Sequence, residues 1–190
     1  MKVLVLNGSP RAGGMVAKLL GAVVEDLRAD IQWVDVPTLN MKFCTGCMAC
    51  RGKGTCILPE DDAHLLAARI READALVVGT PTCWGNMSGP LKVLFDRTVP
   101  VFMGESLRGI PIPRQKGKRA LIITACTTPW PFNIIFPQSR GAIRAIKEVL
   151  RTAGYSTLAS ITRPGSRTSD AIPHALLKKA KAAGLKLIPA

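Results

Sequence analysis

The sequence predicts an α/β fold in which a parallel β-sheet is covered by helices on both faces. Short continuous apolar runs, such as VLVL, ALVVGT and ALIITA, alternate along the chain with segments whose apolar residues recur at helical spacing. Continuous apolar runs are typical of strands buried on both faces, and strands that alternate with helices are typical of parallel sheets. The 190 residues, of which 47% are hydrophobic, suffice for one domain with a sizeable core. We therefore expect residues 1–190 to form a single domain.

The first half of the chain predicts three strands and three helices. The first strand ends at Gly8-Ser9-Pro10, and Pro37 closes the second. A cysteine-rich loop at 40–58 follows, and the acidic segment 59–62 then opens a helix, because carboxylates stabilise a helix N-terminus. In chain order, we expect a strand at 2–7, a helix at 15–27, a strand at 31–36, a helix at 59–72, a strand at 75–80 and a helix at 89–97.

The second half predicts two strands and two helices after a long excursion. Residues 99–117 are rich in proline and glycine and are expected to lie outside the sheet. A basic amphipathic helix then ends at Gly154, a residue type that commonly terminates helices. We expect a strand at 120–125, a helix at 139–153, a strand at 155–162 and a final helix at 171–183.

The loop after the first strand is a candidate phosphate site, because parallel α/β sheets bind ligands at the carboxyl ends of their strands. Its glycines allow close approach of the backbone, and the helix that follows offers free N–H groups. The loop matches neither G-x-G-x-x-G nor the G-K-[ST] P-loop, so a phosphomonoester fits better than a dinucleotide or a nucleoside triphosphate. A plain strand-to-helix turn is the alternative. The candidate ligands are Ser9, Arg11, Gly13 and Gly14.

The loops after the third and fourth sheet strands have the composition of walls for a flat ring. Pro81, Trp84 and Gly85 indicate a rigid wall, and Asn86 can hydrogen-bond to polar ring atoms. We interpret Cys83 and Cys126 as packing and backbone positions rather than redox thiols. A phosphate cradle with two such loops predicts a flavin mononucleotide (FMN) site. Its expected ring contacts are Pro81, Thr82, Cys83, Trp84, Gly85, Asn86, Met87, Ala125, Cys126 and Thr127.

Four of the six cysteines lie within thirteen residues and predict a metal site. Three of them form a C-x2-C-x2-C run, which is typical of an iron–sulfur cluster, and the fourth follows after five intervening residues. Zinc more often uses two C-x2-C pairs separated by a longer stretch, but zinc and metal-free thiols both remain alternatives. The candidate ligands are Cys44, Cys47, Cys50 and Cys56.

Composition and charge exclude some function classes. Apolar runs fall well short of the ~20 residues of a membrane span, and the N-terminus becomes polar too early for a signal peptide. We therefore expect a cytoplasmic protein with reduced thiols, which disfavours a disulfide framework.

Residues 96–190 hold 16 Lys and Arg against 4 Asp and Glu, which predicts either a solvated basic face or a docking surface for an acidic partner. The few aromatic residues disfavour nucleic acid.

Three motifs together resemble one family. Gly8-Ser9-Pro10-Arg11 is similar to a phosphate loop, and Thr80–Ser88 with Leu91-Lys92 and Asp96-Arg97 is similar to a flavin loop and its helix. The four clustered cysteines leading into Asp61-Asp62 are similar to a cluster motif. The combination, over roughly residues 1–165, resembles the NAD(P)H-dependent FMN reductase branch of the flavodoxin-like superfamily, most closely its iron–sulfur flavoproteins. At Met15 and Val16 the chain departs from the polar and hydroxyl residues that this phosphate loop usually carries.

The resemblance implies a fold, cofactors and partners. The fold would be flavodoxin-like, with five parallel strands in the order 2-1-3-4-5 between two helix layers. The protein would be an FMN-dependent oxidoreductase that passes electrons through a [4Fe-4S] cluster on Cys44, Cys47, Cys50 and Cys56 to FMN. The electron donor would be NAD(P)H or an acidic ferredoxin-like protein, and the assembly a homodimer or homotetramer. The alternatives are an NAD(P)H-dependent FMN or quinone reductase without a cluster, and an FMN-binding thiol redox sensor.

Overall fold

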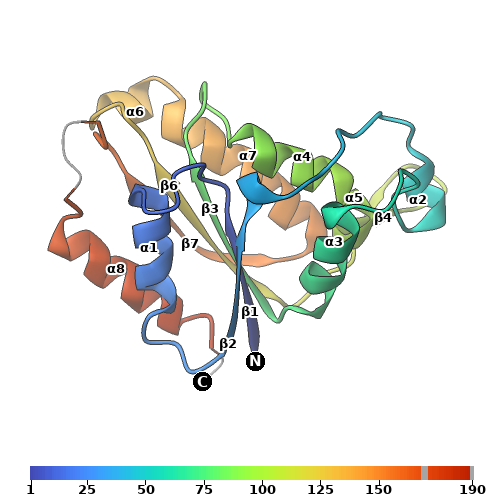
Figure 1. The fold of residues 1–190 in the computed structure, drawn as a ribbon, viewed down its shortest axis with the longest axis horizontal. Helices are drawn as coiled ribbons and strands as arrows, with labels where there is room; N and C mark the ends of the chain where they lie inside the picture. Colours follow the sequence, from blue (N-terminus) through green and yellow to red (C-terminus); the bar gives the residue numbers. More distant parts are fainter. Residues whose placement is uncertain (168–170, 189–190) are drawn as a thin grey trace.

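A computed structural model describes residues 1–167 and 171–188 and has an α/β architecture (Figure 1). Five parallel strands form one sheet in the order β2-β1-β3-β6-β7. Counted among these five strands alone, the order is the expected 2-1-3-4-5, and the labels differ because β4 and β5 form a separate antiparallel pair. The strands are β1 (Lys2–Asn7), β2 (Asp30–Asp35), β3 (Ala75–Pro81), β4 (Met103–Glu105), β5 (Pro111–Pro113), β6 (Arg119–Ala125) and β7 (Ser156–Arg163).

Helices lie on both faces of the sheet, as the continuous apolar runs predict. The expected helices begin and end close to their predicted bounds, with three exceptions: the first ends at Val24 rather than at 27, the acidic helix starts at Asp62 rather than at 59, and the last helix starts at His174 rather than at 171. The helices are α1 (Met15–Val24), the 3-10 helix η1 (Val36–Thr38), α2 (Ala49–Lys53), α3 (Asp62–Glu72), α4 (Gly89–Arg97), α5 (Val99–Phe102), α6 (Phe132–Ile135), α7 (Gln138–Ala153) and α8 (His174–Leu185).

Two apolar cores, one on each face, hold the layers together. Alternate residues of the central strands point to opposite faces, so Leu4 and Leu6 enter one core while Val3 and Val5 enter the other. The first core also receives side chains from α3, α4, α5 and α7, and the second from α1 and α8. In Figure 1 these two groups of helices lie on opposite sides of the sheet.

The excursion at 99–117 is more ordered than the sequence predicts. It contains α5 and the antiparallel pair of β4 with β5. These strands have three residues each, and two of the three residues of β5 are proline, so they carry no periodic signal. Within the described parts of the chain, no helix is long and apolar enough to cross a membrane.

Candidate functional site

The loop after β1 has a fixed position against β3 and α4. The amide of Gly8 donates to the carbonyl of Gly79 at 2.7 Å, and the hydroxyl of Ser88 donates to the carbonyl of Gly8 at 2.7 Å. A Cβ at Gly8 would lie only 3.0 Å from the Gly79 carbonyl oxygen and 3.0 Å from the Ser88 hydroxyl, so a larger residue would have to push these partners away. The chain therefore enters α1 from a defined point at the carboxyl edge of the sheet.

The start of α1 presents unpaired backbone donors. The buried Ser9 is oriented by its amide, which donates to Asn7 Oδ1 at 3.1 Å, while its hydroxyl accepts from the amide of Arg11 at 3.2 Å. Gly14 caps α1 without a side-chain hydrogen bond from any described residue, so the first-turn N–H groups remain available. The Arg11 guanidinium is exposed and likewise has no partner within the described residues. This arrangement suits an anionic group.

The loop after β3 is a tight turn joined to the end of β6. The amide of Thr82 donates to the carbonyl of Ala125 at 2.8 Å, and Cys83 and Asn86 exchange two backbone hydrogen bonds of 2.9 Å. The residues between them, Trp84 and Gly85, have φ angles of 50° and 71°, as a two-residue turn of this kind requires. The turn thus holds the residues on either side of it in place at the carboxyl edge.

These loops enclose a cavity of about 560 Å³, within the range of small-molecule sites. The hydroxyl oxygen of Thr82 is buried beside it and has no hydrogen-bond partner among the residues described, which leaves a polar atom for a ligand. The cavity brings together nine predicted residues: Ser9, Arg11, Gly13, Gly14, Pro81, Thr82, Cys83, Ala125 and Thr127. It is also lined by Pro10, Met15, Val16, Lys18 and Ser166, which the sequence analysis does not name as ligands.

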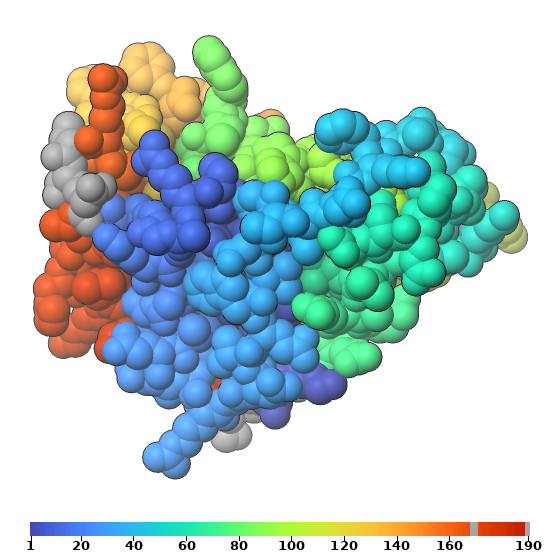
Figure 2. All heavy atoms as spheres, viewed as in Figure 1, coloured from blue at the N-terminus to red at the C-terminus, as the bar shows by residue number. Residues whose placement is uncertain are grey.

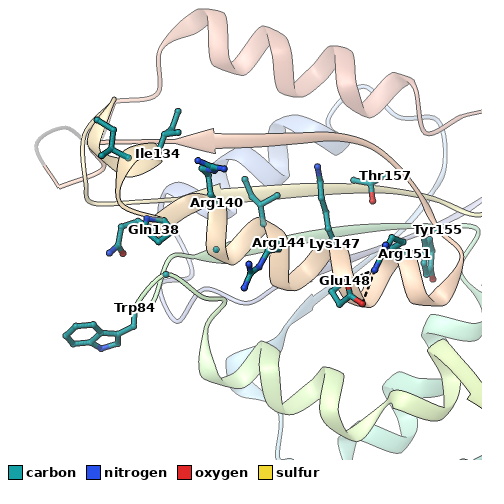
Figure 3. A pocket seen from close by; sticks show the side chains of 15 residues that line it. Trp84, Ile134, Gln138, Arg140, Arg144, Lys147, Glu148, Arg151, Tyr155 and Thr157 are labelled. Carbon is teal, nitrogen blue, oxygen red and sulfur yellow. Dashed lines mark hydrogen bonds and ion pairs between the residues drawn. The ribbon is translucent and has the colours of Figure 1, made fainter. Parts of the chain in front are cut away.

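Five predicted ring contacts lie outside this cavity. The indole of Trp84 is fully exposed and points away from the protein, and Gly85 lies beside it (Figure 3). Asn86 and Met87 line a separate, mostly apolar cavity of about 350 Å³ between α4, α5 and α7. Cys126 is buried, and its backbone donates to Arg163 and accepts from Ser166, which agrees with the backbone role predicted for it.

A groove of about 1090 Å³ runs along α7 beside the Trp84 turn (Figure 3). Its polar wall is a row of cations at helical spacing, and Ile134 and Ile135 add apolar lining, with Ile134 toward the same end as Trp84. Glu148 pairs with one of these cations, Arg151, at 3.0 Å, whereas the other three have no ion-pair partner in the described parts of the chain. The cationic row of α7 consists of Arg140, Arg144, Lys147 and Arg151.

The cysteine loop lies at the other end of the molecule from α1. Figures 1 and 2 show the segment around α2, coloured cyan to teal, projecting from the side near β4 and α5. Arg51 of α2 pairs with Glu105 of β4 at 2.6 Å, which ties the loop to the antiparallel strand pair. Cys44 and Cys47 are exposed, and Cys50 and Cys56 are half-buried.

The four thiols interact electrostatically, although they do not form a ready metal cage. Burial, together with the negative charges of Cys56, Cys44 and Cys47, raises the pKa of Cys50. Hydrogen bonds from the Ala49 backbone and the Thr45 side chain lower the pKa of Cys47. All six cysteines are free thiols, and among the described residues no three or more His, Cys, Asp or Glu side chains are arranged to hold a metal ion.

A sequence profile described as NADPH-dependent FMN reductase matches residues 1–128. The chain belongs to this family. The match covers β1 to β6 and therefore all the loops of the 560 Å³ cavity except the one that carries Ser166. As the name of the family indicates, its members are oxidoreductases that act with NADPH and FMN.

Curated relatives of this family member carry two kinds of name. It is 32% identical over 112 residues to an iron–sulfur flavoprotein of Methanocaldococcus jannaschii, which is 57% of each chain. It is 36% identical over 106 residues to an iron–sulfur flavoprotein of Archaeoglobus fulgidus, or 55% of this chain and 52% of that one. It is 33% identical over 117 residues to an NADH-dependent FMN reductase of Pseudomonas putida, or 59% and 57%. The chain spans about half the length of the curated relatives it matches.

Solved structures support the fold. An azoreductase from Bacillus anthracis superposes with a TM-score of 0.74 over 98% of this chain and 99% of that one, at 18% identity. An FMN-dependent NADH-azoreductase from the same species, in complex with FMN, superposes with a TM-score of 0.67 over 98% of each chain, at 16% identity. At such low identity these similarities establish only that this FMN reductase family member has their fold.

The two implied cofactors fit the residues to different degrees. For FMN, the uncapped start of α1, the unpartnered Thr82 hydroxyl and a cavity of suitable size all agree with a phosphorylated ligand. For an iron–sulfur cluster, four thiols are the right donors, but their described arrangement does not converge on one point. The cluster therefore fits by donor chemistry only, and assembly would require the loop to move.

Sequence reasoning missed several residues of these sites. Lys18 was detectable, because it lies one turn beyond Gly14 on α1 and so on the same face. Ser166 follows β7, whose loop was not among those considered. His64 is not among the predicted site residues, yet its Nδ1 is 3.2 Å from the Asp61 amide nitrogen in a capping box, and its Nε2 is 3.2 Å from the Cys56 carbonyl oxygen. The burial of Arg97 could not be predicted from the sequence, because charged residues are rarely buried.

Proposed function

We propose that this protein is a cytoplasmic oxidoreductase that binds one FMN in the 560 Å³ cavity and transfers electrons from a donor to an acceptor through it. The observation that carries the proposal is the pairing of two features across the cavity. Among the residues that the structure describes, neither the N–H groups at the start of α1 nor the buried hydroxyl of Thr82 has a hydrogen-bond partner, and both belong to the lining of this cavity. Membership of the FMN reductase family supports the identity of the ligand.

Each wall of the cavity has its own proposed part. The amides from Arg11 to Gly14 and the Arg11 guanidinium would bind the phosphate, because anions are stabilised at helix N-termini and by charge-assisted hydrogen bonds. Pro81, Thr82 and Cys83 would line one edge of the ring, and Ala125 and Thr127 the other. When bound, the flavin supplies the one- and two-electron redox chemistry, and the protein orients it.

Replacement of Arg11 tests the binding site. Arg11→Ala removes a charge-assisted contact worth about 1.5–3 kcal/mol, so FMN affinity should fall roughly ten- to hundredfold. Fluorescence titration of apoprotein with FMN measures this change. Arg28→Ala, which removes an exposed arginine beyond the end of α1, is the matched control and should leave affinity unchanged. Equal affinities of the two variants would show that the phosphate lies elsewhere.

We further propose that Cys44, Cys47, Cys50 and Cys56 bind a [4Fe-4S] cluster. The spacing of the thiols, their mutual electrostatic effect on Cys50 and the names of the archaeal relatives support this proposal. Anaerobic reconstitution with iron and sulfide should load about four irons per chain, a load that Cys47→Ser loses while FMN stays bound. Cys83→Ser, outside the loop, is the control for a lost thiol. Failure of the reduced wild type to take up iron leaves the FMN reductase without a cluster, or the thiol sensor.

The cationic row of α7 is our proposed docking surface for an acidic ferredoxin-like donor, with NAD(P)H as the alternative donor. Three cations of this row have no ion-pair partner within residues 1–167 and 171–188, and they lie in the same groove as Trp84, whose turn borders the FMN cavity; both observations support the proposal. Reduction by an acidic ferredoxin should slow steeply between about 0.01 and 0.1 M salt, where the Debye length falls from ~30 to ~10 Å. The double variant Arg144→Glu, Lys147→Glu should be reduced by the ferredoxin more slowly than wild type. The control double variant Lys178→Glu, Lys179→Glu on α8 should be reduced at the wild-type rate. A rate independent of salt would leave a solvated basic face.

We also propose a homodimer or homotetramer. Several large apolar side chains near α6 are exposed, including Trp130, Phe132, Ile135 and Phe136, and association would remove them from water. Light scattering of the eluted protein measures the mass, and Ile135→Asp should lower it to that of the 20.3 kDa chain if this surface is the interface.

A further inference from the structure

Arg97, at the end of α4, has the most completely buried charged side chain among the described residues, and it faces the cysteine loop. Its side chain is 0% exposed, although arginine is seldom buried without a specific set of partners. The helix that carries it is fixed in the core by Leu91, Leu94 and Phe95. The backbone of Arg97 is therefore fixed relative to the sheet, and its buried side chain extends from that point toward the cysteine loop.

All three guanidinium nitrogens of Arg97 are engaged with the two ends of that loop. Nη1 donates to the carbonyl of Lys42 at 2.6 Å, where the loop begins, and to Asp61 at 2.7 Å, where it ends. Nη2 donates to the other carboxylate oxygen of Asp61 at 3.0 Å. Nε donates to the sulfur of Cys56 at 3.3 Å. The planar fork of arginine can reach these points together, whereas the single ammonium of lysine cannot.

Among the described residues, the other three thiols have no comparable anchor. Within the same residues, the sulfur of Cys44 accepts a side-chain hydrogen bond only from the amide of Gly46, which belongs to the loop itself, at 3.5 Å. Cys47 is exposed, and Cys50 lies on the five-residue helix α2, whose main contacts are with α5 and β4 of the excursion. The loop thus combines one sulfur that a core arginine contacts directly with three sulfurs that receive no such contact from the core within the described residues.

We propose that Arg97 is the positioning residue of the cysteine loop: it fixes the sulfur of Cys56, and the sulfurs of Cys44, Cys47 and Cys50 converge on that fixed point when a metal cluster assembles. The proposal rests on the cluster-binding function proposed above. It explains why four thiols of the right kind and spacing for a cluster are present although their sulfurs are not arranged around one point in the described structure. The hydrogen bond from Nε is also of the kind that tunes a sulfur ligand.

The same helix connects the two candidate sites. α4 begins directly after the Thr80–Ser88 loop that borders the FMN cavity, and it ends at Arg97. A nine-residue helix is about 13 Å long, so Arg97 sets the cysteine loop at a fixed offset from the flavin loop. Arg97 would then position Cys56 relative to both the other thiols and the flavin site.

The contact is tested first without metal. In protein labelled with ¹⁵N-arginine, the Nε–H signal of Arg97 should exchange slowly with solvent, and Cys56→Ala should shift it and speed its exchange by roughly tenfold or more. Cys44→Ala, which removes a thiol of the same loop, should leave the signal in place. An Arg97 signal that does not respond to Cys56→Ala would overturn the proposal.

The positioning role is tested next with iron. After anaerobic reconstitution, Arg97→Lys should lose iron roughly ten- to hundredfold faster than wild type, the usual effect of removing a partner of a metal ligand. Its FMN content should match that of wild type, and Arg69→Lys, an exposed arginine of α3, should match wild type in both. Iron held equally long by Arg97→Lys would refute the role. If Arg97→Lys does not fold, the NMR experiment on the cysteine variants still decides whether Arg97 holds Cys56. If wild type takes up no iron, the same NMR experiment decides that contact, and the missing iron counts against the cluster proposal itself.

Discussion

The FMN cavity and the cysteine loop, the two candidate sites, are held in place by different kinds of contact. The loops of the FMN cavity are joined by backbone hydrogen bonds, from Gly8 to Gly79 and from Thr82 to Ala125. The cysteine loop is attached through side chains, chiefly Arg97 with Asp61, and Arg51 with Glu105. A loop held by backbone hydrogen bonds tolerates changed side chains but not an added Cβ where two backbones meet. A loop held by side chains is disrupted when one of those side chains is replaced. The predictions below follow from this contrast.

The largest effect should come from removing the carboxylate under Arg97. Asp61→Asn leaves a buried guanidinium without its counter-charge, so the free energy of unfolding should fall by about 3–5 kcal/mol, as measured by urea denaturation. Glu60→Gln, at the exposed neighbouring residue, should change it by less than about 0.5 kcal/mol. If the loops are attached independently, FMN affinity of folded Asp61→Asn should equal that of wild type. A fall in that affinity would show that the attachments are coupled.

The backbone contacts are tested by adding a Cβ where α7 meets the Trp84 turn. A Cβ at Gly141 of α7 would lie 2.0 Å from the carbonyl oxygen of Gly85, so Gly141→Ala must displace either the Trp84 turn or the helix. We expect a loss of about 1–3 kcal/mol in unfolding free energy, and weakened FMN binding. Gly21→Ala in α1 is the matched control, because a Cβ there meets no described atom within 4 Å and should stabilise the helix by about 0.5–1 kcal/mol.

A smaller effect concerns pH. Burial opposes ionisation of Asp61, but hydrogen bonds from Arg97 and from the Lys42 and Ala63 amides outweigh it and lower its pKa. A carboxylate whose pKa is lower in the folded protein contributes stability that is full above its unfolded pKa, about 3.9, and is lost as pH falls further. Wild type should therefore lose stability below about pH 4 more steeply than Asp61→Asn does. Parallel stability curves for the two proteins over that range would contradict this assignment.

The smallest effect should distinguish two thiols within the cysteine loop. The pKa of Cys47 is lowered and that of Cys50 is raised, so at neutral pH Cys47 should be alkylated faster in metal-free protein. Mass spectrometry of timed alkylation measures both rates. The ratio of the rates should shrink as pH rises, because both thiols then become thiolates. A ratio independent of pH would mean that exposure alone controls their reactivity.

The sheet was predictable from sequence, because its strands are buried on both faces and their apolar runs are continuous, as in Ala75–Pro81 and Arg119–Ala125. The position of the loop after β1 was predictable for a related reason, since Gly8 and Ser9 follow such a strand directly, whereas its phosphate-binding role stays a prediction. The direction of Trp84 was not predictable, because it depends on the φ angles of a two-residue turn. Arg97 was not predictable either, because its partners Lys42, Cys56 and Asp61 lie between 36 and 55 positions away along the chain.

The exposure of the indole of Trp84 has a practical consequence for spectroscopy. All three tryptophans are substantially exposed in the folded chain: Trp33 at 38%, Trp84 at 101% and Trp130 at 71%. Since indole emission responds mainly to transfer between apolar surroundings and water, intrinsic fluorescence should change little in wavelength when the isolated chain unfolds. The same signal should be well suited to reporting association, because a flavin, a donor or a second subunit that covers Trp84 changes the surroundings of an otherwise fully hydrated ring.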